Sequence, residues 1–157
     1  MKRFVMITVL SAVALAVALS VGAWGKGQGN GHKGRGHAVS VIEHATTDAT
    51  TDTGAAGDSA GDVLTFANEV FDAGDSKKVG TDNGYCIRTV AGTAYECNWT
   101  TFLPAGQITV EGPFYDAKDS TLAITGGTGR YRHVRGTMDL QSREGGTKYA
   151  FVFHLNS

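Results

Sequence analysis

Hydrophobic and polar residues alternate with a period of two over most of the chain after residue 37. Such alternation places every second side chain on one face of an extended segment, so it predicts β-strands with one buried face. Eight segments have this pattern: residues 38–45, 63–72, 78–90, 93–103, 107–116, 120–125, 136–142 and 148–155. Clusters of glycine, proline and polar residues separate them, as at Pro104-Ala105-Gly106, and these clusters predict turns.

The same pattern indicates the fold class. No amphipathic helical pattern interrupts these segments, which favours an all-β domain. Short antiparallel strands with tight connections remove their exposed edges by closing into a barrel, and about eight strands leave room for one small ligand. We therefore predict an eight-stranded antiparallel β-barrel with a hydrophobic cavity over residues 38–157.

The first 37 residues have a different composition. Lys2 and Arg3 precede an apolar run, and small residues follow it up to Ala23, which is typical of a secretory signal peptide over residues 1–23. The alternative is an uncleaved membrane anchor, because about 20 apolar residues span a bilayer. Residues 24–37 are glycine-rich and predict a flexible linker. We expect a secreted protein that has no membrane contact after cleavage of the signal peptide.

Charge and motifs exclude several function classes. The net charge is −1 and charged residues make up 18% of the chain, so we expect no nucleic-acid partner. Arg130, Arg132 and Arg135 are clustered, and we interpret them as a solvated rim or a subunit contact. No Cys/His spacing typical of a metal site and no G-x-S-x-G motif is present, so no metal and no nucleophile triad are expected.

The two cysteines lie on either side of a predicted hairpin turn at Ala91-Gly92. Strands that fold back around this turn place Cys86 opposite Cys97 and Val90 opposite Thr93. In the oxidising compartment that an exported chain meets, such a pair forms a disulfide, worth about 3 kcal/mol in the chain-entropy model. Two buried free thiols are the alternative.

Three segments carry a resemblance to a known family. LAITGGTGRYRHVRG, residues 122–136, has three glycines in four positions, which allow a sharp reversal after a strand. This motif resembles the GGTG motif shared by plant dirigent proteins and allene oxide cyclases. GDVLTFANEVFDAGDSKKVGTDNGYC (61–86) and ITVEGPFYDAKDSTLAITGGTG (108–129) are similar to the cyclases, and the resemblance extends in order over residues 38–155.

The resemblance implies a fold, an assembly and a set of site residues. The family fold is an eight-stranded antiparallel barrel with a hydrophobic cavity, usually a homotrimer. In the cyclases a glutamate on the first strand lies beside the substrate epoxide, and an asparagine holds a water against the epoxide oxygen. Glu43 and Asn68 match these two positions and are the candidate catalytic residues. The candidate ligand-binding residues are Leu64, Phe66, Cys86, Tyr95 and Phe114.

Several positions depart from the cyclase pattern. Ala45 replaces a second asparagine, Phe114 replaces a tyrosine, and a Ser-Pro pair has no counterpart in the polar segment 46–61. If Cys86 is in a disulfide, the pocket also lacks its thiol. These departures concern allene oxide cyclase activity itself rather than the presence of a pocket.

We therefore expect a secreted barrel that binds a small hydrophobic unsaturated substrate and steers its cyclisation or isomerisation without a cofactor. Such a protein would be an isomerase in which Glu43 stabilises positive charge or acts as a base. One alternative is a dirigent-like protein that steers the stereoselective coupling of radicals made by a separate oxidase. Another is a non-catalytic module that binds hydrophobic ligands.

Overall fold

The computed structural model describes residues 37–156. The predicted signal peptide and residues 24–36 of the predicted linker lie outside the described residues. Within residues 37–156 the regular structure is β-strand, apart from two short 3-10 turns, η1 (Gly129–Tyr131) and η2 (Glu144–Gly146). In this part of the chain there is no helix with the length and apolar character that crossing a bilayer requires.

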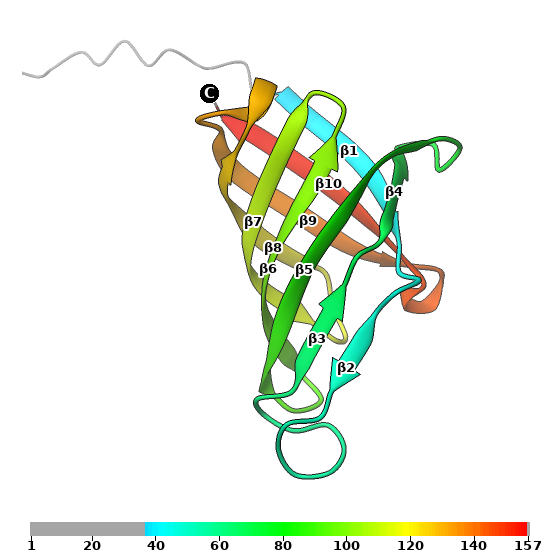
Figure 1. Cartoon of the computed structure of the whole chain (residues 1–157), viewed down its shortest axis with the longest axis vertical. Helices are drawn as coiled ribbons and strands as arrows, with labels where there is room; N and C mark the ends of the chain where they lie inside the picture. Colours follow the sequence, from blue (N-terminus) through cyan, green and yellow to red (C-terminus); the bar gives the residue numbers. More distant parts are fainter. Residues whose placement is uncertain (1–36, 157) are drawn as a thin grey trace, which may run out of the picture. The chain divides into compact units, whose positions relative to one another are not determined.

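The strands are β1 (His37–His44), β2 (Ala49–Thr51), β3 (Val63–Phe66), β4 (Glu69–Asp72), β5 (Lys78–Val90), β6 (Ala94–Leu103), β7 (Gly106–Tyr115), β8 (Ser120–Gly127), β9 (Arg135–Arg143) and β10 (Lys148–Asn156). All neighbours are antiparallel, in the order β2-β3-β5-β4-β1-β10-β9-β8-β7-β6. β5 also pairs with β6, which closes the sheet into the barrel seen in Figure 1.

The barrel has eight strand positions because two of its strands are interrupted. β1 and β2 form one interrupted strand and β3 and β4 form another, with β4 paired to β1, β3 paired to β2, and both paired to β5. The predicted eight-stranded antiparallel barrel is thus confirmed. Two details of the prediction were wrong: the strand over residues 63–72 is broken at Ala67-Asn68, and the polar segment 46–61 contains β2.

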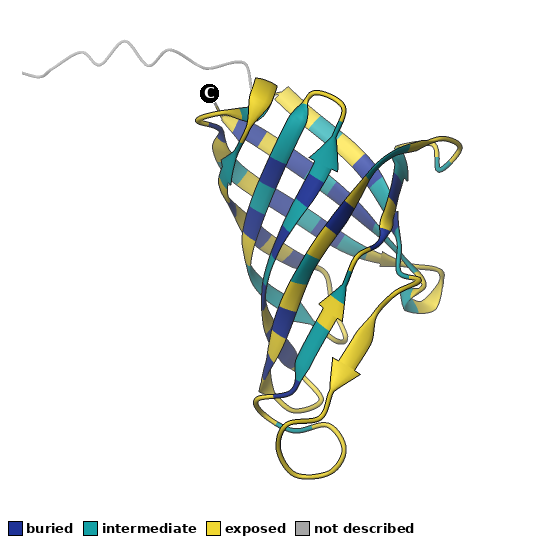
Figure 2. Cartoon of the chain, viewed as in Figure 1, coloured by how far each residue is buried: buried dark blue, intermediate teal, exposed yellow. Residues whose placement is uncertain are grey.

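Alternation along the strands places one set of side chains inside the barrel. Figure 2 shows buried and exposed residues in turn along the long strands, whereas β2 and the connection that follows it are exposed. Phe153, Met138 and Leu122 are cross-strand neighbours on β10, β9 and β8, and each is at most 1% exposed. This layer fills the lumen, and one layer along, at Phe151 and Leu140, a pocket begins.

The β5–β6 hairpin carries a disulfide between Cys86 and Cys97, which face each other directly as predicted. The predicted pairing of Val90 with Thr93 was wrong. The register shifts after Arg88, so that Val90 faces Ala94. The Thr93 amide instead donates to the Val90 carbonyl at 3.1 Å and closes the turn, in which Gly92 has a φ of 64°.

Candidate functional site

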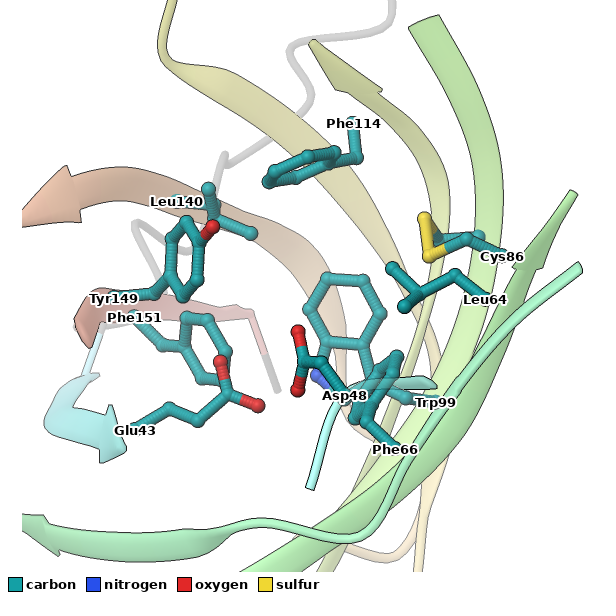
Figure 3. Close-up of a pocket in the computed structure, with 11 residues that line it drawn as sticks. Glu43, Asp48, Leu64, Phe66, Cys86, Trp99, Phe114, Leu140, Tyr149 and Phe151 are labelled. Atoms are coloured by element: carbon teal, nitrogen blue, oxygen red, sulfur yellow. A yellow bond between two sulfur atoms is a disulfide. The ribbon is translucent and has the colours of Figure 1, made fainter. Parts of the chain in front are cut away.

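A pocket lies inside the barrel between the two interrupted strands and the opposite wall (Figure 3). It encloses about 70 Å³, several times the ~10–15 Å³ that one water molecule needs. Its lining residues are Glu43, Asp48, Leu64, Phe66, Cys86, Cys97, Trp99, Phe114, Leu140, Tyr149 and Phe151. Phe114, Leu140 and Tyr149 also line a wider outer cavity of about 580 Å³ beside the β7–β8 and β9–β10 connections.

The alternation of β1 turns Glu43 into this pocket. Val41 and Glu43 are 3% and 5% exposed, and Glu43 faces Tyr149 on β10 and Val70 on β4. Burial is the largest influence on its carboxyl group, because a low-dielectric surrounding disfavours the charged form. It raises the pKa of Glu43 to about 7, and the nearby Asp48 carboxylate acts in the same direction. Hydrogen bonds from Asn68 and Asp82 oppose the rise.

Asn68 holds the site together from the break between β3 and β4. Its Nδ2 group donates to Glu43 Oε1 at 2.9 Å and to Asp48 Oδ1 at 2.7 Å. Its Oδ1 atom accepts bonds from the amides of Thr46 and Thr47, at 3.0 and 2.9 Å, and from the Thr47 hydroxyl at 2.9 Å. The side chain therefore replaces the missing sheet pairing where both interrupted strands break, and it sets the direction of the two carboxyl groups.

A third carboxyl group, on Asp82, lies behind Glu43. Asp82 is 1% exposed and makes two hydrogen bonds to the Asn68 backbone: its own backbone amide donates to the Asn68 carbonyl at 3.0 Å, and its side-chain Oδ1 accepts from the Asn68 backbone amide at 3.3 Å. Burial, and next the negative charge of Glu43, raise the pKa of Asp82 to about 9. Both effects favour the protonated form of Asp82.

Aromatic rings and the disulfide form the rest of the wall. Trp99 lies between Phe66 and Phe151, with ring centroids 6.0 and 5.5 Å apart, and Phe114 meets Tyr149 edge-on at 5.7 Å. Burial raises the pKa of Tyr149, so its phenol is neutral at neutral pH. The Cys86 position lines the pocket as part of the disulfide, which leaves no thiol there.

Six of the seven residues named from the sequence meet at this pocket or its hydrogen bonds: Glu43, Asn68, Leu64, Phe66, Cys86 and Phe114. Tyr95 is not among the lining residues. It is 8% exposed and lies behind Phe114, with the Arg88 guanidinium 3.6 Å above its ring centre. Arg88 is in turn paired with Asp116 and Asp58, so Tyr95 belongs to the packing under the pocket rim.

Six further residues at the site were not predicted from the sequence: Asp48, Asp82, Trp99, Leu140, Tyr149 and Phe151. Trp99 had a usable signal, because it shares a strand face with Cys97, and Tyr149 and Phe151 share a face in the same way. Asp48 had none, since it lies in a polar low-complexity segment. Within residues 37–156, no three His, Cys, Asp or Glu side chains are arranged to hold a metal ion.

Three solved structures are similar to this chain. A pyocyanin demethylase is 26% identical, with a TM-score of 0.69 over 76% of this chain and 100% of its own. The exo-specific intermolecular Diels-Alderase AbnU is 16% identical, with a TM-score of 0.63 over 78% of this chain and 98% of its own. The pterocarpan synthase dirigent protein PsPTS1 is 18% identical, with a TM-score of 0.59 over 78% and 97%. At these identities the last two show the shared fold alone.

Sequence comparison extends beyond the fold. Residues 40–157 match the family of allene oxide cyclases, and this range contains the barrel from Ser40, the fourth residue of β1, to the end of β10. The resemblance that the GGTG motif indicated is therefore confirmed over most of the chain. By this match the protein is a member of the allene oxide cyclase family.

Proposed function

We propose that this barrel binds a small, largely apolar, unsaturated molecule and steers its cyclisation or isomerisation, with Glu43 moving a proton. The observation that supports this most is a 5%-exposed carboxyl group whose pKa is raised to about 7, in a pocket whose other lining residues, apart from Asp48, are mainly aromatic and aliphatic. A general acid or base works best when its pKa is near the working pH. The proposal involves no cofactor, because an intramolecular rearrangement transfers no net electrons.

The pocket supplies orientation as well as a proton. Flat walls made by Trp99, Phe66 and Phe114 favour one folded conformer of a conjugated ligand, and holding reacting atoms in place contributes several kcal/mol to catalysis. The Glu43 carboxylate removes a proton from a carbon or oxygen of the ligand. The electron pair moves into the conjugated system, and the proton returns to another ligand atom. The neutral Tyr149 phenol is a hydrogen-bond donor for a ligand oxygen.

The experiment starts from the ligand. Whatever small molecule co-purifies with the protein is identified by mass spectrometry and then incubated with the wild-type protein and with Glu43→Gln. We expect wild-type protein to convert it to an isomer of equal mass, and Glu43→Gln to bind it but lose at least about 100-fold in rate. Glu96→Gln, on an exposed position of β6, is the matched control and keeps full activity. Equal rates in wild type and Glu43→Gln would contradict the proposal.

A second candidate is binding without turnover of a planar aromatic ligand. The aromatic walls, whose rings meet edge-on or tilted, offer contact area to a flat ring system, and the 26% identical relative is a pyocyanin demethylase. Pyocyanin itself is a usable probe, because its binding quenches the fluorescence of Trp99. Saturable quenching without any product supports this candidate over the first. A dirigent role predicts instead that product chirality changes only when an oxidase is present.

The location and assembly of the protein are part of the proposal. We propose that the chain is secreted, because the Cys86–Cys97 disulfide fits an oxidising compartment and residues 1–23 have the composition of a signal peptide. N-terminal sequencing of protein from the culture medium tests this, with a start near residue 24 expected. We also propose a homotrimer, by resemblance to the family, which light scattering during gel filtration tests.

A further inference from the structure

Asp82 is the buried carboxyl group that the proposed function does not use. It lies on β5 opposite Thr101 of β6, and both side chains face the interior, at 1% and 0% exposure. Asp82 is not a lining residue of the pocket, so a ligand there does not touch it. Any effect of Asp82 on a bound ligand is therefore indirect, through its neighbours Glu43 and Asn68.

The two oxygens of Asp82 have different surroundings. Oδ1 accepts a hydrogen bond from the Asn68 backbone amide at 3.3 Å, whereas Oδ2 is fully buried and has no hydrogen-bond partner among the described residues. The Thr101 hydroxyl, on the facing residue, also has none. A buried carboxylate oxygen without a donor is very unfavourable, and it is doubly so beside a second carboxylate. A proton on Oδ2 removes both penalties, because the acid can then donate to Glu43.

We propose that Asp82 is a positioning residue, an acid that stays protonated at neutral pH, donates a hydrogen bond to Glu43 and holds it as a carboxylate facing the pocket. Glu43 then has two donors, the Asn68 side-chain amide at 2.9 Å and the Asp82 acid. Between about pH 7 and pH 9 the two carboxyl groups hold one proton between them. The consequence for catalysis rests on the proposed function, whereas the protonation of Asp82 does not.

The groups that face this pair come from three elements. Asp48 enters from the β1–β2 connection, Tyr149 from β10, and the Asn68 amide from the β3–β4 break. No ion pair among residues 37–156 includes Glu43 or Asp82. With no cation beside the pair, a donated proton is what remains to stabilise the Glu43 anion.

Carboxyl ¹³C NMR tests the protonation of Asp82 without any ligand. The protein, labelled at Asp and Glu carboxyl carbons, is titrated from pH 4 to pH 10 as wild type, Glu43→Gln, Asp82→Asn and Asp82→Leu. Comparison with Asp82→Asn assigns the Asp82 resonance. We expect it to report a protonated acid at pH 7 in wild type, and its midpoint to fall by about one pH unit or more in Glu43→Gln, where the neighbouring charge is gone.

The Glu43 resonance distinguishes a donor from a merely structural residue. The amide of Asp82→Asn still donates, so the Glu43 midpoint stays near that of wild type. Asp82→Leu removes the donor, and the Glu43 midpoint rises by about one pH unit, with a parallel shift of any pH–rate profile. Asp119→Asn, at an exposed residue, changes neither midpoint.

An Asp82 that ionises in the ordinary acidic range, or a midpoint unaffected by Glu43→Gln, would overturn the inference. If Asp82→Leu does not fold, the Glu43→Gln comparison decides alone. Failure of the proposed function gives a different result. If that proposal is wrong and this inference is right, Asp82 titrates as expected, yet Glu43→Gln converts the co-purified ligand as fast as wild type does.

Discussion

Asn68 shows how much of this site depends on one side chain. Its amide satisfies two carboxyl groups and its carbonyl oxygen accepts three donors from Thr46 and Thr47, all close to where both interrupted strands break. A residue with one donor group and one acceptor group is needed there, because a carboxylate would repel Glu43 and Asp48 and an apolar side chain would leave every partner unsatisfied. The sequence motif identified Asn68, but not that its main contacts are within the protein.

Asn68→Ala is therefore expected to lower the free energy of unfolding by about 1–3 kcal/mol for the buried groups it leaves without partners. It also removes a hydrogen bond that holds the pKa of Glu43 down, so the Glu43 midpoint rises. Urea denaturation and carboxyl NMR measure the two effects. Asn98→Ala, on the outer face of β6, is the control, and a loss no larger than that of this control would contradict the role assigned to Asn68.

The buried carboxyl pair also predicts how stability depends on pH. Glu43 and Asp82 have folded-state pKa values above their ordinary ones, about 7 and about 9, because burial disfavours their charges. Their contribution is present at acidic pH and is lost as the pH rises through these values. We expect the free energy of unfolding to fall by on the order of a few kcal/mol between pH 5 and pH 9.

Urea denaturation at the two pH values measures this fall, and Asp82→Asn should reduce it. Asp62, Asp72, Asp75 and Asp139 do not interfere, since their pKa values are lowered and their effects lie below about pH 4. A wild-type stability that is flat or rises over this range would show that the pair is not buried as described.

At the scale of elements, the GGTG motif is a close approach of three backbone segments. It joins β8 to η1, and Gly129 has a φ of 58°, which favours glycine. A Cβ atom on Gly127 would lie 2.5 Å from the Tyr131 carbonyl oxygen and 2.6 Å from that of Gln107. The motif that identified the family thus meets a packing requirement of the barrel. Its closest contacts are with backbone atoms of Tyr131 and Gln107, and not with Glu43.

Gly127→Ala should lower the free energy of unfolding by about 1–3 kcal/mol, because backbone atoms must move to admit the methyl group. Gly126→Ala is the matched control on the neighbouring residue. A Cβ there meets nothing within 4 Å, so little change is expected. Thermal unfolding of the two variants compares them directly. Equal melting temperatures would mean that the close approach at Gly127 does not constrain the fold.

At the scale of the whole molecule, the barrel combines a filled part with an open part. The layer of Phe153, Met138 and Leu122 supplies buried apolar area, while the next layer leaves about 70 Å³ unfilled, continuous in its lining with the outer cavity. The disulfide joins β5 to β6 beside this open part. A barrel with an unfilled pocket has less internal packing than a filled one. A bound ligand stabilises it because the ligand binds only the folded state, and the disulfide stabilises it because it constrains the unfolded chain.

A ligand should therefore raise the melting temperature of the protein. Binding at 100 times the dissociation constant adds about 2.7 kcal/mol to the free energy of unfolding. Leu64→Trp is expected to fill the pocket and abolish this rise while the fold is kept, whereas Val90→Trp, at a 54% exposed position, leaves it unchanged. Differential scanning fluorimetry with pyocyanin as the probe measures both, and a rise that survives Leu64→Trp would place the ligand elsewhere.

The sequence by itself predicted the number of barrel strands, their antiparallel pairing and the pairing of the two cysteines, and its resemblance to the cyclases named Glu43 and Asn68. Each of these follows from local information: the period of two, the turn residues, and motifs within short segments. The candidate ligand-binding residues that the resemblance named on β3, β5 and β7 all face inward, because every second residue of a strand shares one face.

Only the tertiary structure decided what meets across the lumen. Asp82 shares a face of β5 with Cys86, so its inward direction was predictable, but it reaches Glu43 only because β4 lies between β1 and β5. Asp48 has no signal in its polar segment, and it meets Glu43 at the Asn68 amide, where β1 and β2 are interrupted. Tyr95 has the right periodicity, yet Phe114 and Arg88 cover it. Periodicity tells whether a side chain points inward, whereas its neighbours there, and hence its charge, depend on residues distant in sequence.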